Sequence, residues 1–428
     1  MERGARRRGH SRSNFLNGLS VDDLTTVAER EKGAGVPTNQ LSVERGEERN
    51  KTRSARSRWL LGGLLVALIP TVYFFSQLAR PGGLLNLIQF GTQFEASSVP
   101  DVAGLHPPRD FLHGYDAQYY AQIAMDPFLR DPRTGAAVDD AGYRARRIFL
   151  PLISNVLGFG NPALTLNILA SLNYVFFLAL LGAVILAVRP TSPPLWAVVA
   201  AAVLTTGTMD SLHRALSDLP AATLIFVAVV FPLAATRIAL LATAILTRET
   251  AVLSAIPCVI GLPLFERRNF VRLCAVVLPA VAWYVYLFLH LRSWGGGPDG
   301  NFELPGAAIV QRVAVGWSDF LERPNDRRFF LLLTPICLVV QAIYLWRFPK
   351  LDSALWWSGI AFTALLFILG PQVWVGNIAA TRVLLPMTIA FNVLLAVQRP
   401  AHFWPWFVAG NAGLLWGLRK LTIDLGMT

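Results

Sequence analysis

Residues 148–188 read IFLPLISNVLGFGNPALTLNILASLNYVFFLALLGAVILAV, a long run without a charged side chain. A hydrocarbon core about 30 Å thick is crossed by about 20 apolar residues in a helix, so this run can hold one span and part of another. Two more long runs, 59–79 and 353–381, also lack charges. The sequence therefore predicts a polytopic membrane protein.

The composition excludes an ordinary soluble domain. Of the 428 residues, 54% are hydrophobic and 15% are charged, whereas soluble domains carry about 25% charged residues. The apolar segments do not show the ten-residue alternation that is typical of outer-membrane barrels. Because every backbone group in lipid must be satisfied internally, helices remain, and we expect an all-α fold.

About eleven apolar segments are candidate spans or parts of spans. They are residues 59–79, 162–188, 193–209, 219–236, 238–247, 250–265, 273–290, 329–346, 354–370, 383–398 and 401–418. The segment 238–247 is too short to cross a bilayer alone and ends in ionisable residues, which is typical of a broken helix at a membrane face. Together they predict a transmembrane domain over residues 59–420, followed by a short C-terminal tail, 421–428.

Charge placement predicts the orientation. Residues 1–58 hold 13 Lys or Arg against 8 Asp or Glu, a balance of +5, and are expected to be a disordered cytoplasmic tail. Counting spans onward from a cytoplasmic N terminus puts two long loops, 80–147 and 291–328, outside, together with Arg419 and Lys420. Residues 148–159 are expected to form a helix at the outer interface. Basic residues at span ends are orientation signals, so nucleic-acid binding is not expected.

The centre of the first outside loop reads HGYDAQYYAQIAMDP over residues 113–127. A helix that begins near Asp116 places Tyr119 and Tyr120 on the same face as that carboxylate. One interpretation is that Asp116 caps the helix. The other is that Asp116 is a general base, which takes the proton of an acceptor hydroxyl among aromatic and amide side chains that bind a sugar.

Three arginines follow in YRARRIFLP, residues 143–151. Arg144, Arg146 and Arg147 precede the predicted interfacial helix, where basic side chains bind lipid headgroups. A guanidinium also matches phosphate bidentately, so the same side chains could hold a lipid-linked phosphate. The sequence leaves both interpretations open.

Further charges fall at the same predicted membrane face. Asp218 begins one apolar run, Arg248 and Glu249 lie between two others, and Arg382 begins a fourth. Charges at the edge of a bilayer are costly and are usually functional or paired. The structural interpretation is capping by Asp218 or ion pairing, for instance of Asp218 with Arg248. The functional one is that these groups converge on one outer site.

The order of these features resembles the GT-C class of membrane glycosyltransferases, which have a cytoplasmic N terminus, a first span and then a large extracytoplasmic loop with a catalytic Asp. The quoted segments GYDAQYYAQIA, YRARRIFLPLI, LSDLPAATL, LTRETAVL and TRVLLPM are similar to the pattern of the GPI mannosyltransferase II family and its bacterial relatives. The resemblance covers roughly residues 59–400. It implies a protein of the bacterial cytoplasmic membrane that uses a polyprenyl-phosphate-linked sugar donor, with membrane lipids as its surroundings.

The resemblance also implies roles for residues. Asp116 would be the catalytic base. Substrate-binding residues would be Tyr115, Gln118, Tyr119, Tyr120, Asp126, Asp218 and Glu249. From their charge and their predicted side of the membrane, the residues expected to bind the lipid phosphate are Arg144, Arg146, Arg147, Arg248 and Arg382. GYDAQ contains one Asp rather than an Asp-X-Asp pair, which leaves open whether a divalent cation, Mg²⁺ or Mn²⁺, takes part.

Two other functions compete with this one. A transporter or flippase of lipid-linked saccharides would show inverted repeats and ionisable groups near the bilayer midplane. The sequence shows no internal repeat, and its charges gather at an edge. A GT-C-like membrane protein without catalytic activity is the third interpretation. Transfer of a sugar at the outer membrane face is the function that we expect.

Overall fold

The computed structural model describes residues 59–231, 234–260, 266–296 and 299–425. Within these ranges the chain forms α-helices and 3-10 turns, and β-pairing is limited to two isolated bridges, Gly91 with Phe111 and Phe302 with Leu369. The prediction of an all-α fold is therefore confirmed. The predicted cytoplasmic tail, residues 1–58, lies outside the described residues.

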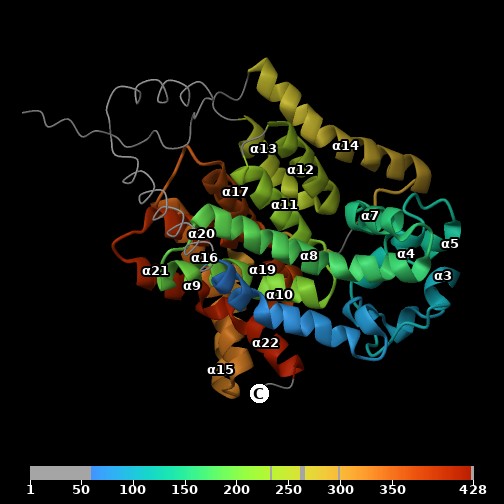
Figure 1. Ribbon diagram of the computed structural model, residues 1–428, viewed down its shortest axis with the longest axis horizontal. Helices are drawn as coiled ribbons and strands as arrows, with labels where there is room; N and C mark the ends of the chain where they lie inside the picture. Colours follow the sequence, from blue (N-terminus) through green and yellow to red (C-terminus); the bar gives the residue numbers. More distant parts are fainter. Residues whose placement is uncertain (1–58, 232–233, 261–265, 297–298, 426–428) are drawn as a thin grey trace, which may run out of the picture. The chain divides into compact units, whose positions relative to one another are not determined.

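The first long loop is built from short helices (Figure 1). They are η2 (Gly83–Leu87), η3 (Thr92–Phe94), α3 (Pro100–Ala103), α4 (Ala117–Met125), α5 (Pro132–Ala136) and α6 (Ala141–Arg144). The remaining elements are α7 (Phe149–Gly158), α8 (Pro162–Val188), α9 (Pro193–Val203), α10 (Thr206–His213), α11 (Asp218–Val230), α12 (Ala234–Thr247), η4 (Glu249–Ala251), α13 (Val252–Ile260), α14 (Arg267–Leu291), α15 (Ala307–Glu322), α16 (Asp326–Arg347), α17 (Ala354–Ile368), α18 (Pro371–Trp374), η5 (Val375–Asn377), α19 (Ile378–Val383), α20 (Leu385–Gln398), α21 (Phe403–Asn411), η6 (Ala412–Leu414) and α22 (Trp416–Asp424).

Four described helices are long and apolar enough to cross a membrane: Trp59–Leu78, α8, α14 and α16. Two bent pairs raise the number to six if each pair forms one span. The expected count of about eleven is not confirmed. The reason is length, since α11, α12 and α17 have 13, 14 and 15 residues. At a rise of about 1.5 Å per residue they reach only about 20 Å.

Several predicted spans are broken rather than continuous. The segment 193–209 divides into α9 and α10, which are bent by 48°. The predicted span 383–398 forms a pair with the residues before it, Pro371–Val383, at an angle of 52°. The segment 401–418 divides into α21, η6 and α22, and α22 continues to Asp424, so residues 421–424 of the predicted C-terminal tail are helical.

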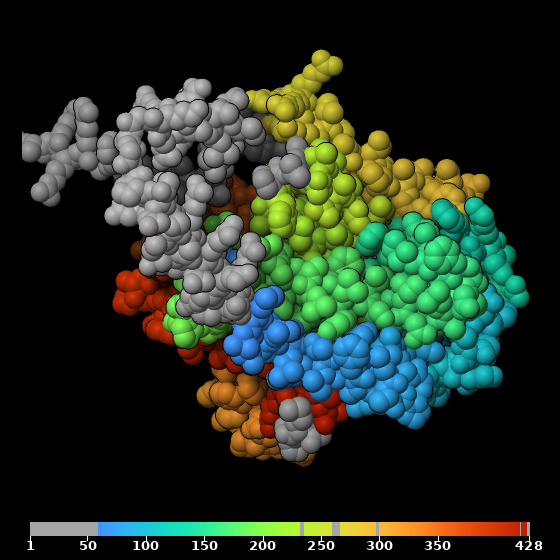
Figure 2. Space-filling view, in the orientation of Figure 1, coloured from blue at the N-terminus to red at the C-terminus, as the bar shows by residue number. Residues whose placement is uncertain are grey.

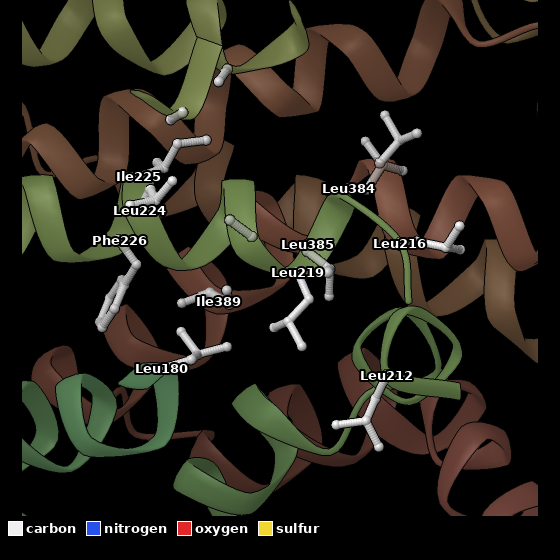
Figure 3. Packing of buried hydrophobic residues seen from close by; sticks show 14 of the residues in the cluster. Leu180, Leu212, Leu216, Leu219, Leu224, Ile225, Phe226, Leu384, Leu385 and Ile389 are labelled. Atoms are coloured by element: carbon white, nitrogen blue, oxygen red, sulfur yellow. The ribbon is translucent and has the colours of Figure 1, made fainter. Parts of the chain in front are cut away.

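The core lies around α20. All twelve residues from Leu385 to Ala396 are buried, as expected of a helix that is apolar on every side. Figure 3 shows Leu385 and Ile389 beside Leu219 and Phe226 of α11 and Leu180 of α8. Exposed apolar side chains lie elsewhere. In the helix Trp59–Leu78, on the surface in Figure 2, the side chains of Leu60, Leu64 and Leu68 are exposed.

The C-terminal half of the first loop is attached to α14. α14 donates side-chain hydrogen bonds to it, from Trp283 Nε1 to the carbonyl of Ala145 (2.8 Å) and from Tyr286 Oη to the carbonyl of Phe128 (2.7 Å). After the loop, α7 is a separate short helix. It is followed by Phe159, whose φ of 47° marks a sharp turn and whose side chain is 87% exposed. The helix predicted over 148–159 is therefore present, and these contacts hold the loop against the bundle.

Candidate functional site

Asp116 stands at the start of α4 without capping it. Its side chain accepts no hydrogen bond from the first turn of the helix, so the capping interpretation is wrong. Instead its Oδ1 lies 3.1 Å from Nη1 of Arg144. Among the described residues Oδ2 has no hydrogen-bond or ion-pair partner, and 31% of the side chain is exposed. One carboxylate oxygen is thus fixed by Arg144, while the other is available to a ligand.

Arg144 is itself held in place. Its Nε and Nη2 donate to the two carboxylate oxygens of Asp139 at 2.9 and 2.7 Å, and its guanidinium lies 4.9 Å from the ring centroid of Tyr119. Burial raises the pKa of Asp116, but the positive charges of Arg144 and Arg382 outweigh that effect and lower this pKa below its usual value. Asp116 is therefore an ionised carboxylate at neutral pH.

Arg147 donates four hydrogen bonds within the site. It donates to both oxygens of Glu249, from Nε at 2.9 Å and from Nη2 at 2.6 Å. It also donates to the hydroxyls of Tyr120 (3.0 Å) and Tyr143 (2.8 Å). Only 4% of Arg147 is exposed. A guanidinium with this many protein partners has little capacity left for a lipid phosphate. Through Glu249, Arg147 joins the first loop to η4.

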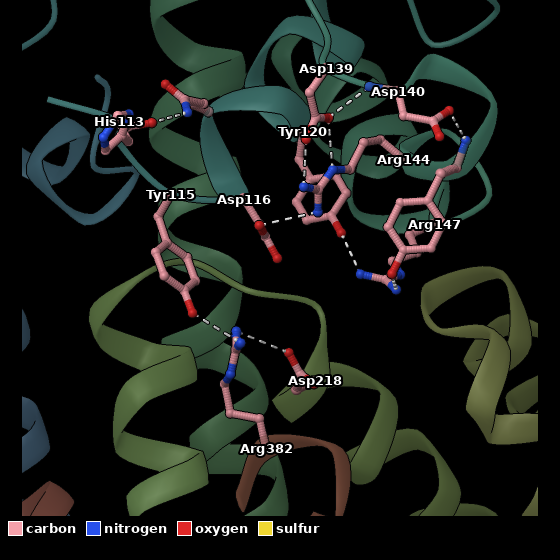
Figure 4. Close-up of polar contacts among 12 residues, drawn as sticks. His113, Tyr115, Asp116, Tyr120, Asp139, Asp140, Arg144, Arg147, Asp218 and Arg382 are labelled. Atoms are coloured by element: carbon pink, nitrogen blue, oxygen red, sulfur yellow. Dashed lines mark hydrogen bonds and ion pairs between the residues drawn. The ribbon is translucent and has the colours of Figure 1, made fainter. Parts of the chain in front are cut away.

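A second group of charges lies beneath Tyr115. Arg382 donates from Nη2 to the Tyr115 hydroxyl at 3.0 Å, and its Nη1 lies 3.6 Å from Asp218 Oδ2 (Figure 4). Arg248 Nη1 lies 2.6 Å from Asp218 Oδ1, so the Asp218–Arg248 ion pair suggested by the sequence is confirmed. Arg214 pairs with Asp210 at 3.0 Å, and its guanidinium lies 4.1 Å from the ring centroid of Tyr115.

Three arginines of this second group retain unused donors. In the described part of the chain, the buried Nε–H groups of Arg214, Arg248 and Arg382 have no hydrogen-bond acceptor. The Nε atom of Arg382 lies 3.6 Å from Asp210, beyond hydrogen-bond distance. A buried donor without an acceptor costs about 1–3 kcal/mol. This group of charges therefore has donor capacity that its partners among the described residues do not use.

The site gathers four segments that are far apart in the sequence. Asp116 and Arg147 come from the first loop, Asp218 begins α11, Glu249 begins η4 and Arg382 lies in α19. Contacts link them: Tyr115 joins the loop to Arg382, Arg147 joins it to Glu249, and Asp218 joins Arg248 to Arg382. The structure thus brings together the charges that the sequence places at one membrane face.

Several of the expected binding residues make contacts within the protein. Gln118 is buried. Its side-chain oxygen accepts a hydrogen bond from the backbone N–H of Gly91, and its side-chain nitrogen donates one to the carbonyl of His113, each at 2.9 Å. Asp126 accepts a hydrogen bond from the backbone amide of Asp131, and Arg146 donates to the carbonyls of Trp294 and Gly295 in the second long loop. Tyr119 and Tyr120 are buried under Arg144 and Arg147 respectively. These side chains shape the loop and leave little for a substrate.

Four residues of the site are not predicted from the sequence: Asp139, Asp210, Arg214 and Tyr143. Asp210 and Arg214 carry a usable signal, since opposite charges four residues apart in an apolar stretch favour a helical ion pair. Asp139 and Tyr143 carry none, because their contacts depend on how the loop folds.

The described residues contain no group of three or more His, Cys, Asp or Glu side chains that could hold a metal ion. Comparison of the chain with protein-family models, with curated proteins and with solved structures finds no match.

Proposed function

We propose that the protein is a membrane glycosyltransferase of GT-C type. It transfers a sugar from a polyprenyl-phosphate-linked donor to an acceptor hydroxyl at the extracytoplasmic face of a bacterial cytoplasmic membrane. The observation that carries this proposal is the juxtaposition of an ionised, partly exposed carboxylate with buried arginines that retain unused N–H donors. A base for the acceptor and a binding site for a departing phosphate are the two elements that such a transfer requires.

Asp116 is the base in this proposal. The acceptor oxygen attacks the anomeric carbon, the bond from that carbon to the phosphate oxygen breaks, and the acceptor proton passes to Oδ2 of Asp116. The contact of Oδ1 with Arg144 fixes the carboxylate so that Oδ2 is the atom presented. A lowered pKa keeps the carboxylate in its proton-accepting form over the whole physiological range.

Arg214, Arg248 and Arg382 receive the leaving group. Polyprenyl phosphate gains one negative charge as its bond to the sugar breaks, and donors arranged beforehand stabilise that charge most. Together with Asp210 and Asp218, these three arginines carry a net charge of +1 (three minus two). A monoanionic phosphodiester donor would balance this charge. Arg144 and Arg147 position the loop and are not phosphate ligands in this assignment.

The test is an assay of sugar incorporation by the full chain in lipid vesicles, using a panel of radiolabelled polyprenyl-phosphate sugars and a membrane lipid extract. We expect Asp116→Asn to lose activity by about 100-fold or more, since general-base catalysis contributes about 10²–10⁴. The matched control is Asp110→Asn, which changes an exposed acid of the same loop. An Asp116→Asn protein as active as wild type would refute the proposal. Movement of intact lipid-linked sugar across the vesicle without a new glycosidic bond would favour the flippase.

A further inference from the structure

Arg144 lies between two carboxylates, Asp116 of the candidate site and Asp139 in the turn before α6 (Figure 4). Its contacts with the two differ. To Asp139 it presents the Nε–Nη2 edge of the guanidinium, which donates one hydrogen bond to each carboxylate oxygen. To Asp116 it presents Nη1, which lies 3.1 Å from Oδ1. The bidentate partner of Arg144 is therefore Asp139 and not the carboxylate that is proposed as the base.

The bidentate contact determines where the guanidinium of Arg144 lies. Two parallel N–H···O bonds fix both the position and the plane of the group. Two aromatic rings pack near the same group, because the guanidinium carbon lies 4.9 Å from the ring centroid of Tyr119 and 5.4 Å from that of Tyr143. With 11% of its side chain exposed, Arg144 has little freedom to move. Asp139 thus holds it where Nη1 reaches a single oxygen of Asp116.

Each arginine whose positive charge acts on Asp116 also has another acidic partner. These arginines are Arg144, Arg147, Arg248 and Arg382. Arg144 pairs with Asp139, Arg147 pairs with Glu249, and Arg248 and Arg382 share Asp218. With Asp116 included, four positive charges are balanced by four negative ones. If Asp139 lost its charge, Asp116 would be the remaining carboxylate partner of Arg144 among the described residues.

Two effects on Asp116 would follow from that loss. Arg144 could turn toward Asp116 and contact both of its oxygens, including Oδ2, the atom that receives the proton in the proposed reaction. Its positive charge would also no longer be shared with Asp139, which would lower the pKa of Asp116 further and make it a weaker base. Both effects oppose the transfer of a proton to Asp116.

We propose that Asp139 is a positioning residue for the transfer: it holds Arg144 so that this arginine contacts one oxygen of Asp116 and leaves the other for the acceptor proton. The inference rests on the proposed function, because it concerns the base of that reaction. Asp139 itself touches no reacting atom in this scheme and acts through Arg144.

Asp139→Asn keeps the shape of the side chain and removes its charge. In the incorporation assay we expect kcat to fall by about 10–100-fold, since a misplacement of about 1 Å can cost about 100-fold. The KM for the donor should change by less than about twofold. The matched control is Asp131→Asn. Asp131 also accepts from Nε and Nη2 of an arginine of the first loop, Arg133, and is equally exposed, at 37% against 36%. This control should keep the wild-type kcat.

The Arg144→Gln background tests whether Asp139 acts through Arg144. Without the guanidinium, the further change Asp139→Asn should alter kcat by less than about twofold, because the two residues act as one unit. An equal loss of kcat in both backgrounds would indicate a merely structural role and would overturn the inference. A wild-type kcat for Asp139→Asn would overturn it as well.

An infrared titration separates this inference from the proposed function. The carboxyl band that Asp116→Asn abolishes reports the protonation of Asp116 in the full chain in vesicles, without any turnover. We expect Asp139→Asn to move the midpoint about one pH unit lower, and Arg144→Gln to move it higher. A midpoint that stays or rises in Asp139→Asn contradicts the inference, whether or not the protein transfers sugar. A wild-type protein that transfers no sugar refutes the proposed function, and the infrared shift still decides how Asp139 acts on Asp116.

Discussion

Glu249→Gln tests whether the Arg147–Glu249 pair holds the first loop against the bundle. The substitution keeps the shape of the side chain but removes the negative charge beside a guanidinium that is 4% exposed. Removal of one partner of a buried pair costs about 3–5 kcal/mol. Arg147 keeps the hydroxyls of Tyr120 and Tyr143 as acceptors, so we expect the low end, about 3 kcal/mol. At about 2 °C per kcal/mol in a large domain, the midpoint of thermal unfolding falls by roughly 6 °C.

The double-mutant cycle isolates the pair. Arg147→Met leaves Glu249 with 32% of its side chain exposed and therefore hydrated, so its expected cost is smaller, about 2 kcal/mol. If the two residues interact, the double variant loses about 3 kcal/mol rather than the sum of about 5. Thermal unfolding of each protein in the same nanodiscs provides the measurement, with Glu303→Gln as the exposed control. Additive losses within about 0.5 kcal/mol would refute the reasoning.

The same pair gives a pH dependence. Burial raises the pKa of Glu249, but the charge of Arg147 and its hydrogen bonds lower that pKa from its ordinary 4.5 to about 2. A depressed carboxyl pKa contributes stability above the unfolded value and loses it as pH falls through the folded one. Wild-type stability should therefore decrease between about pH 4.5 and pH 2. Arg147→Met should lack this component, and an unchanged profile in that variant would argue against the assignment.

Three further predictions concern the candidate reaction. Arg144→Gln removes the nearest positive charge from Asp116, so the pKa of that carboxyl should rise. The acid limb of the profile of kcat/KM against pH should then move to higher pH. An acid limb that does not move would show that Asp116 does not cause it. Arg382→Lys keeps the charge but loses the planar pair of N–H donors of the guanidinium. We expect kcat to fall by about 10–100-fold with a smaller change in KM. A change in KM alone would mean that Arg382 binds the donor substrate but does not stabilise the transition state. Because arginines can neutralise the leaving phosphate, EDTA should lower turnover by less than about twofold, and loss of activity that Mg²⁺ or Mn²⁺ restores would contradict this expectation.

The sequence predicts the helical class and the break before α8 well, because both depend on local signals. Gly160 and Pro162 interrupt an uncharged run, and the structure ends α7 and begins α8 there. The number of membrane spans, by contrast, is not predicted by hydropathy. Whether residues 219–236 cross a bilayer depends on where the helix stops. α11 ends at Val230, and Phe231 precedes Pro232, which disfavours the helical conformation at the residue before it; hydropathy alone does not contain this local signal.

The site shows the same division. The sequence identifies Asp116, Asp218, Glu249 and Arg382 because charges are rare in apolar surroundings. It cannot assign their partners, since a guanidinium such as Arg147 is a phosphate ligand or a structural clamp according to what the loop brings beside it. For the same reason the sequence does not show that the side chain of Gln118 accepts a hydrogen bond from the backbone of Gly91, in a different part of the loop.

The sequence separation of the ion pairs has a consequence for how the protein is made. Asp218 pairs with Arg248, which follows it closely in the chain, and with Arg382, which lies near the C-terminal end. At about 5–20 residues per second, synthesis of the interval from Asp218 to Arg382 takes roughly 10–30 s. During this time a carboxylate destined for a buried position lacks its second cation. The insertion machinery or an open, hydrated arrangement of the early helices must therefore accommodate Asp218 until α19 arrives. The charge cluster around Asp218 is then completed only by the C-terminal part of the chain.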